Sequence, residues 1–174
     1  MGRFEGKIAI VTGGASGIGR SICTYLGRHG AQVIVADLNL EGAQKTVASI
    51  SARGGRAGAA YVDVTDSDDV ASLIGDVVRD LGRIDLLFNN AGIVGAIGPI
   101  ETTPSDEWAF TLNVLLNGVF YGMKHAARVM KPQESGSIIS MSSVAGVTGG
   151  LGPHAYAAAK TAVVGLTKNV GAEL

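Results

Sequence analysis

Residues 7–20 read KIAIVTGGASGIGR, in which a short apolar run leads into a glycine-rich turn and then directly into a helical pattern. Glycine lets the backbone turn sharply and approach a ligand closely, because it has no Cβ. The helix that follows would present free N–H groups and a partial positive charge, which suits a diphosphate. The turn, residues 12–19, has the spacing Gly13-x-x-x-Gly17-x-Gly19 and so is neither G-x-G-x-x-G nor a P-loop. An ordinary glycine-rich turn between a strand and a helix is the alternative interpretation.

An acidic residue ends the second apolar run. Asp37 stands where a dinucleotide-binding fold places the carboxylate that holds the adenosine ribose hydroxyls. Such a carboxylate repels a 2′-phosphate, and the next residue is Leu38 rather than Arg or Lys, so the sequence favours NAD over NADP. A helix cap is the alternative role for Asp37, because a helical pattern opens at Leu40.

Short apolar runs alternate with longer amphipathic segments along the rest of the chain. The runs are apolar on both faces, as parallel strands covered on both sides must be. We expect strands at 7–12, 32–36, 57–62, 85–89 and 137–141, and helices at 17–28, 40–53, 67–81, 104–130 and from about 155 to the end. This alternation predicts an α/β fold with a doubly wound parallel sheet, and 174 residues fit a single domain over 1–174.

Local patterns predict several helix ends. We expect Thr103 to cap the fourth helix, with Pro104 in its first position, and the acidic stretch 65–69 to begin the third. Glycines at 30, 54–55 and 82 are expected to close helices in the left-handed conformation.

Composition excludes several classes of function. The formal net charge is −1 with no cluster of Lys and Arg, which argues against nucleic acid or an anionic membrane as a partner. No apolar stretch approaches the roughly 20 residues of a membrane span, and no secretory leader opens the chain. Cys23 is the single cysteine, so no internal disulfide is possible, and no Cys/His cluster has zinc spacing. We therefore expect a cytoplasmic protein without a metal.

Several separated motifs resemble those of the short-chain dehydrogenase/reductase family. They occur in the family's order, with 13 residues from the serine to the tyrosine: the turn at 12–19, Asn89-Asn90-Ala91-Gly92, Asn113, Ser143, and Tyr156-Ala157-Ala158-Ala159-Lys160. The resemblance spans essentially the whole chain. It implies a Rossmann fold and an NAD-dependent oxidoreductase that acts on the CH–OH group of its substrate.

The resemblance also implies a role for each matched residue. The catalytic residues would be Asn113, Ser143, Tyr156 and Lys160. The cofactor would contact Gly13, Ser16, Gly17, Ile18, Gly19, Asp37, Leu38, Asp63, Val64, Asn90, Ala91, Gly92, Tyr156 and Lys160. By the same resemblance, Ser143 would hold the substrate oxygen, Lys160 would bind the nicotinamide ribose, and Asn113 would hold a water linking Lys160 to solvent.

The residue types support this chemistry independently. Tyr156 and Lys160 are four apart, so they share one face of a helix. A nearby ammonium favours tyrosinate, which lets Tyr156 exchange a proton with an alcohol or carbonyl near neutral pH. Each residue also has a plain structural interpretation: a solvated Tyr–Lys pair, a serine that ends a strand, and Asn113 as a buried helix amide. The combination with the upstream turn favours the catalytic interpretation.

The expected substrate is a small, neutral, hydrophobic secondary alcohol or ketone. The segments that would surround it are apolar, with no Lys or Arg placed to bind a carboxylate or phosphate: Ile93, Val94, Ala96, Ile97, Val144 and Gly149-Gly150-Leu151. The resemblance implies a homodimer or homotetramer formed through the long helix and the Tyr156 helix. Two alternatives stay open, an NADP(H)-dependent ketoacyl-type reductase and a non-catalytic NAD-binding module.

The sequence departs from the family at its end. Family members usually continue for several tens of residues beyond the position of Leu174, adding two strands and a mobile loop over the substrate. The sequence is therefore expected to lack the C-terminal strands of the family fold, as a fragment or a natural truncation. A protein ending at Leu174 would then have an exposed sheet edge and is predicted to be aggregation-prone and weakly active.

Overall fold

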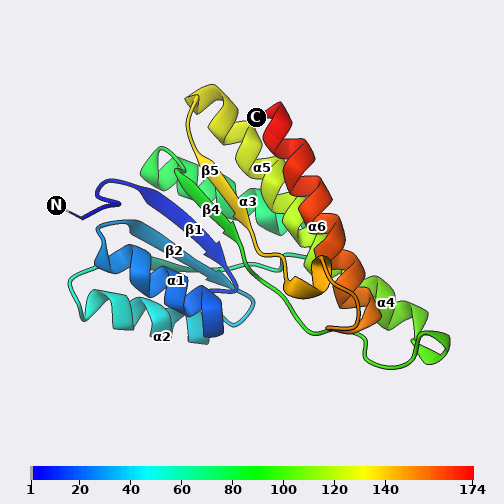
Figure 1. Ribbon diagram of the computed structural model, residues 1–174. Helices are drawn as coiled ribbons and strands as arrows, with labels where there is room; N and C mark the ends of the chain where they lie inside the picture. The colour runs from blue at the N-terminus through cyan, green and yellow to red at the C-terminus, as the bar shows by residue number, and fades with distance from the viewer. Residues whose placement is uncertain (1) are drawn as a thin grey trace.

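Five short strands form one sheet in the order β3-β2-β1-β4-β5 in the computed structural model, which describes residues 2–174 (Figure 1). All neighbouring strands are parallel. The strands are β1 (Ile8–Thr12), β2 (Gln32–Asp37), β3 (Arg56–Tyr61), β4 (Leu86–Asn89) and β5 (Ser137–Ser140). The strand order reverses on either side of β1, which opens a crevice at the carboxyl ends of β1 and β4. The predicted doubly wound α/β fold is confirmed.

Helices cover both faces of this sheet. The α-helices are α1 (Gly17–Arg28), α2 (Leu40–Ser51), α3 (Ser67–Leu81), α4 (Ser105–Leu112), α5 (Gly118–Gln133) and α6 (His154–Glu173). Two short 3₁₀ turns, η1 (Ile100–Thr102) and η3 (Val144–Gly146), and a π-helical segment, η2 (Asn113–Asn117), complete the chain. Helices α1 and α2 lie on one face, and α3, α5 and α6 lie on the other (Figure 1).

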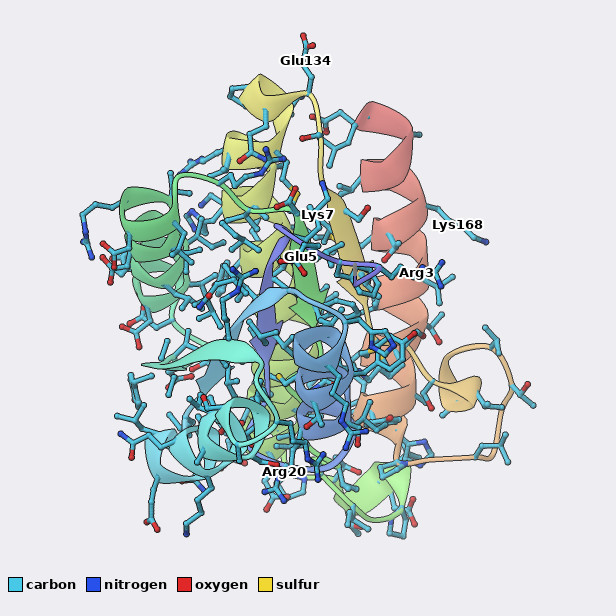
Figure 2. The ribbon with its side chains drawn as sticks, turned by 90° about the vertical axis from the view of Figure 1, so that its left-hand side faces the viewer. Arg3, Glu5, Lys7, Arg20, Glu134 and Lys168 are labelled. Carbon is cyan, nitrogen blue, oxygen red and sulfur yellow. The ribbon has the colours of Figure 1, made fainter. Side chains whose placement is uncertain are left out.

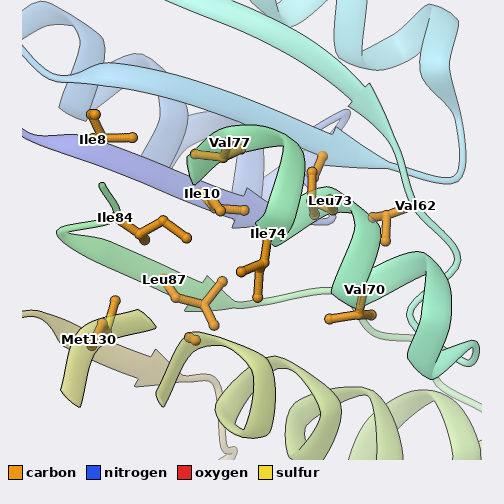
Figure 3. Packing of buried hydrophobic residues seen from close by; sticks show 12 residues of the cluster. Ile8, Ile10, Val62, Val70, Leu73, Ile74, Val77, Ile84, Leu87 and Met130 are labelled. Atoms are coloured by element: carbon orange, nitrogen blue, oxygen red, sulfur yellow. The ribbon is translucent and has the colours of Figure 1, made fainter. Parts of the chain in front are cut away.

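The central strand β1 supplies side chains to both cores. Successive residues of a strand point to opposite faces. Ala9 and Val11 therefore pack with residues of α1 and α2, whereas Ile8 and Ile10 pack against α3 and α5 (Figure 3). Each aliphatic side chain of this size contributes roughly 1.5–3 kcal/mol when it is fully buried. These two cores fix the position of the glycine turn that follows Thr12.

A buried carboxylate joins the amino ends of the central strands. Asp85, which is 4% exposed, accepts hydrogen bonds from the Ile8 N–H at 3.0 Å, from Lys7 Nζ at 3.0 Å, and from Arg83 at 2.7 and 3.1 Å. Burial by itself would raise the pKa of Asp85, but these donors and cations lower it overall. Lys7 lies at the opposite end of the sheet from Arg20, which follows the glycine turn (Figure 2).

Several predicted element boundaries need correction. The predicted helix over 104–130 is divided by the π segment and extends to Gln133. Thr103 does not cap α4; Pro104 occupies the N-cap position, and the Thr103 hydroxyl donates to the Pro99 carbonyl at 2.9 Å instead. Of the paired glycines, only Gly54 has a positive φ, and α2 ends before it. Threonine is a preferred N-cap residue and proline is preferred at the first helical position, but local turn geometry moves both one place outward here.

The two edge strands differ from the prediction of strands covered on both sides. β3 is half-exposed along its length, and neither β3 nor β5 has a second neighbour within residues 2–174. The runs at 57–62 and 137–141 are apolar because they contain alanine and isoleucine, and composition alone does not distinguish an edge strand from a central one. Within the described chain, none of the helices combines the length and apolar character needed to cross a membrane.

Candidate functional site

The glycine turn at 12–19 has a geometry that favours glycine. Gly13 and Gly17 have φ values of +68° and +51°, in the left-handed region. A Cβ added at Gly19 would lie 2.1 Å from the Gly13 carbonyl oxygen, whereas a Cβ added at Gly17 would meet no atom within 4 Å. The turn is therefore closely packed at Gly19 and open at Gly17. The Ser16 side chain does not cap α1, so the N-terminal N–H groups of that helix face the open side without a side-chain partner from the cap.

Asp37 ties the end of β2 to this turn. Its Oδ2 accepts the Ala15 N–H at 2.9 Å, and its Oδ1 accepts the Asn39 N–H at 2.8 Å. The alternative role as a helix cap does not hold, because Asn39 is the N-cap of α2 and its side chain accepts the Gly42 N–H. Ala15 is held through its carbonyl as well, because Arg20 Nε donates a hydrogen bond to that oxygen at 3.0 Å.

A cavity of about 470 Å³ extends from the turn along the carboxyl ends of the strands. The predicted cofactor residues apart from Tyr156 and Lys160 all line it: Gly13, Ser16, Gly17, Ile18, Gly19, Asp37, Leu38, Asp63, Val64, Asn90, Ala91 and Gly92. Ile93, predicted on the substrate side, also lines it, and sequence reasoning missed four further lining residues: Val62, Thr65, Phe110 and Val114. Val62 and Thr65 flank a predicted pair, whereas Phe110 and Val114 come from the long helical region and could be placed here only by tertiary structure.

Thr12 joins the turn to the loop after β4. Its hydroxyl donates to the Phe88 carbonyl at 3.2 Å and accepts the Asn90 and Ala91 N–H groups at 3.1 Å each. The Asn90 amide in turn donates to the Thr12 carbonyl at 2.9 Å. These bonds hold the segment 90–92 against the turn. The sequence analysis quoted Thr12 as part of the turn but gave it no role at the site.

Ser143 and the first turns of α6 are held together by a second set of contacts. Ser143 follows β5 as the N-cap of η3, and its Oγ accepts the Ala145 N–H at 3.2 Å. The Ser142 hydroxyl donates to the Lys160 carbonyl at 2.8 Å, and the Thr161 hydroxyl donates to the Gly146 carbonyl at 2.9 Å. The loop that carries Ser143 is thereby fixed to the helix that carries Tyr156 and Lys160. Ser142 and Thr161 were also missed by sequence reasoning.

Lys160 is a buried cation beside Tyr156. Its Nζ lies 5.7 Å from the centroid of the Tyr156 ring and donates to the Met141 carbonyl at 2.6 Å. Only 5% of Lys160 is exposed, and this burial lowers the pKa of its ammonium. A half-buried tyrosine and a buried lysine one turn apart, on a helix fixed to a serine-bearing loop, are residue types that can hold an oxygen atom and exchange a proton with it.

Asn113 makes its side-chain hydrogen bond within its own segment. It lies in the π segment, where its Oδ1 accepts a hydrogen bond from Asn117 Nδ2 at 2.9 Å. The structure joins the loop of Ser143 to the helix of Tyr156 and Lys160, and the π segment that carries Asn113 packs against the same helix.

The apolar side chains that were predicted to surround the substrate are mostly exposed. Ile97 is 72% exposed, and Val94, Val144 and Leu151 are also largely exposed. Ala96 departs from this pattern because it is buried, with its N–H bonded to the Thr111 hydroxyl at 2.9 Å.

Comparisons with known proteins agree on one family. A family model described as short chain dehydrogenase matches residues 7–174. Zerumbone synthase of Zingiber zerumbet is 46% identical over 99% of this chain and 64% of its own length. (+)-Borneol dehydrogenase 2 of Salvia officinalis is 47% identical over 99% of this chain and 61% of its own length. The crystal structure of an NAD⁺-bound xylitol dehydrogenase superposes with a TM-score of 0.95 at 36% identity, covering 98% of this chain and 66% of that one. The chain thus spans less than two thirds of the length of these curated relatives.

Proposed function

The chain belongs to the short-chain dehydrogenase family, and from this we propose that it transfers a hydride between NAD(H) and a neutral, hydrophobic secondary alcohol or ketone. One observation carries the proposal: the cavity that begins at the glycine turn and Asp37 reaches segment 90–92, and Lys160 lies buried beside Tyr156 on α6. The exposed apolar side chains of segments 93–97 and 144–151 support a substrate without charge.

The residues of the cavity fit a nicotinamide dinucleotide. The open space over Gly17 and the α1 N-terminus without a side-chain cap suit a diphosphate. The Asp37 carboxylate suits a ribose diol and opposes a 2′-phosphate, because no Arg or Lys adjoins it in the sequence. When bound, the nicotinamide ring would supply or accept the hydride. The fit therefore favours NAD over NADP.

Side chains of the protein would carry out the proton transfer that accompanies the hydride transfer. Tyr156 would donate or accept it at the substrate oxygen, and the Ser143 hydroxyl would hold that oxygen in place. The Lys160 ammonium is buried, and its Nζ lies 5.7 Å from the centroid of the Tyr156 ring, so it is placed to stabilise negative charge that develops nearby during proton transfer.

Paired titrations of the chain with NADH and NADPH test the proposal, with Trp108 fluorescence or calorimetry as the readout. We expect saturable binding that favours NADH, together with oxidation of borneol in the presence of NAD⁺. Tyr156→Phe should bind NADH within about twofold of wild type and lose at least about 100-fold in turnover, the usual scale of general acid–base catalysis. Equal turnover by wild type and Y156F would contradict the catalytic role. NADH binding without turnover by wild type would favour a non-catalytic NAD-binding module.

A further inference from the structure

Ala15, in the middle of the glycine turn, is held through both of its backbone polar groups. Its N–H donates to Asp37 Oδ2, at the end of β2, over 2.9 Å. Its carbonyl oxygen accepts hydrogen bonds from two nitrogens of the Arg20 guanidinium, from Nε at 3.0 Å and from Nη2. The turn is therefore bonded on one side to the sheet and on the other side to helix α1, which carries Arg20.

The methyl group of Ala15 is packed against helix α2. Ala15 is 4% exposed, and a Cβ added at Gly42 would lie 2.9 Å from the Ala15 Cβ. Of the residues that hold Ala15, Asp37 is half-buried and Gly42 is buried, whereas Arg20 is exposed. Arg20 can therefore be substituted without leaving a cavity in the core.

The Arg20 contact also fixes the direction of the next N–H group. In a trans peptide the carbonyl and the following N–H point in opposite directions, and no peptide bond within residues 2–174 is cis. Because the Ala15 carbonyl points to the guanidinium, the Ser16 N–H points away from it. Ser16 lines the cavity together with Gly17 and Ile18, which begin α1. Arg20 thus orients the backbone at the place where the diphosphate is proposed to bind.

The guanidinium serves here as a rigid fork on a carbonyl group. Within residues 2–174, Arg20 takes part in none of the salt bridges. Two N–H groups of its planar head converge on one oxygen atom, a geometry that the compact ammonium of lysine does not reproduce. Hydrogen bonds from a charged donor are about twice as strong as neutral ones. The pattern is that of a side chain that holds a backbone segment in place.

We infer that Arg20 is a positioning residue for cofactor binding, which holds the Ala15–Ser16 peptide so that the N–H groups of the turn are directed at the diphosphate. The inference rests on the proposed function. Arg20 acts through the peptide that it bonds and not by contact with a phosphate. Loss of this contact should weaken cofactor binding and leave the chemical step at Tyr156 unchanged.

Titrations of Arg20→Met and Arg20→Lys with NADH and ADP-ribose test this role. Neither side chain carries a fork, so both variants should bind both ligands about tenfold more weakly than wild type, the scale of losing a charge-assisted hydrogen bond. ADP-ribose has the diphosphate but no nicotinamide, so equal losses locate the effect at the diphosphate. Arg28→Met is the matched control, because Arg28 is an exposed arginine at the far end of α1, and it should bind both ligands as wild type does.

Steady-state kinetics separate positioning from a general loss of structure. In R20M the KM for NAD⁺ should rise by about tenfold, while kcat for borneol at saturating NAD⁺ stays within about twofold of wild type. A fall in kcat with an unchanged KM would overturn the inference. Wild-type affinity for NADH in R20K together with weak binding in R20M would overturn it too, because a positive charge alone would then be sufficient.

Hydrogen exchange provides a readout that does not depend on the cofactor. In R20M without ligand, the Ala15 N–H should exchange at least about fivefold faster than in wild type, because the turn has lost one of its two anchors. The Val11 N–H, in β1, is the internal reference for global unfolding. If wild type binds neither NADH nor NADPH, the proposed function fails, and the exchange rate of Ala15 decides the inference: an unchanged rate in R20M overturns it.

Discussion

At the scale of single residues, Asp37 combines a structural and a recognition role. Both carboxylate oxygens accept backbone N–H groups, from Ala15 and Asn39, and the same carboxylate lines the cavity. Removing the whole side chain would disturb the turn as well as the ligand contact. Asparagine removes the charge and keeps one of the two acceptor oxygens, so it should disturb the turn less than removal of the whole side chain.

Asp37→Asn is therefore expected to relax cofactor choice. The loss of negative charge removes the repulsion of a 2′-phosphate, so the affinity for NADPH relative to NADH should rise by about tenfold, or about 1.4 kcal/mol. Paired titrations measure this ratio. Asp63→Asn is the matched control, because Asp63 lines the same cavity but its carboxylate accepts hydrogen bonds from the Thr65 N–H and hydroxyl. An unchanged ratio in D37N would show that Asp37 does not determine cofactor preference.

The two glycines at the end of the turn should respond differently to alanine. Gly17→Ala places its Cβ in open space, so the variant should fold, and its positive φ should lower the free energy of unfolding by about 1 kcal/mol. Because the new Cβ projects into the space proposed for the cofactor, most NADH binding should be lost. Gly19→Ala would bring its Cβ to 2.1 Å from the Gly13 carbonyl and should destabilise the fold itself. Urea unfolding and NADH titration of both variants test the contrast. NADH binding by G17A at wild-type strength would contradict a ligand over this turn.

At the scale of elements, the amino ends of β1 and β4 are held by a buried ion cluster far from the site. Asp85 lies between Lys7 and Arg83 and also accepts the Ile8 N–H. Its partners make its folded-state pKa lower than its unfolded value. The stability that Asp85 contributes is therefore fully present above the unfolded pKa of about 3.9 and is lost as pH falls through the folded pKa.

Asp85→Asn should lower the free energy of unfolding at neutral pH by about 2–3 kcal/mol, because it leaves buried donors and cations without a charged partner. The variant should also lose less stability than wild type when the pH is lowered below about 4. Urea unfolding at several pH values measures both effects. Asp80→Asn is the control, since Asp80 forms an exposed pair with Arg79 and should change stability by less than about 1 kcal/mol. Parallel acid dependence in D85N and wild type would refute the assignment.

At the scale of the whole molecule, the cavity is assembled from segments far apart in the sequence. Its lining comes from the turn after β1, the ends of β2 and β3, the loop after β4, and helix α4 with η2. A ligand in this cavity therefore contacts both halves of the sheet. Binding should stabilise the whole fold rather than one element.

NADH should accordingly raise Tm. At about 100 times its Kd, a ligand that binds only the folded state adds about 2.7 kcal/mol, which corresponds to roughly 5–10 °C for a chain of this size. Differential scanning fluorimetry measures the shift. Y156F should show the same shift as wild type, whereas G17A should show little. A shift of equal size in G17A would indicate that NADH binds elsewhere.

The sequence by itself determined the order of strands and helices along the chain, the position of the glycine turn, the placement of Asp37 at the end of β2, and the motifs that carry Ser143, Tyr156 and Lys160. These features depend on local properties: hydrophobic periodicity, the conformational freedom of glycine, and the spacing of residues along one helix. Tertiary structure alone decided the edge position of β3, the partners of Asp85, and the contribution of Phe110 to the cavity. It also placed Leu115 against Gly92 and the Tyr156 helix, because a π segment alters which side chains face inward and leaves no clear trace in the residue pattern.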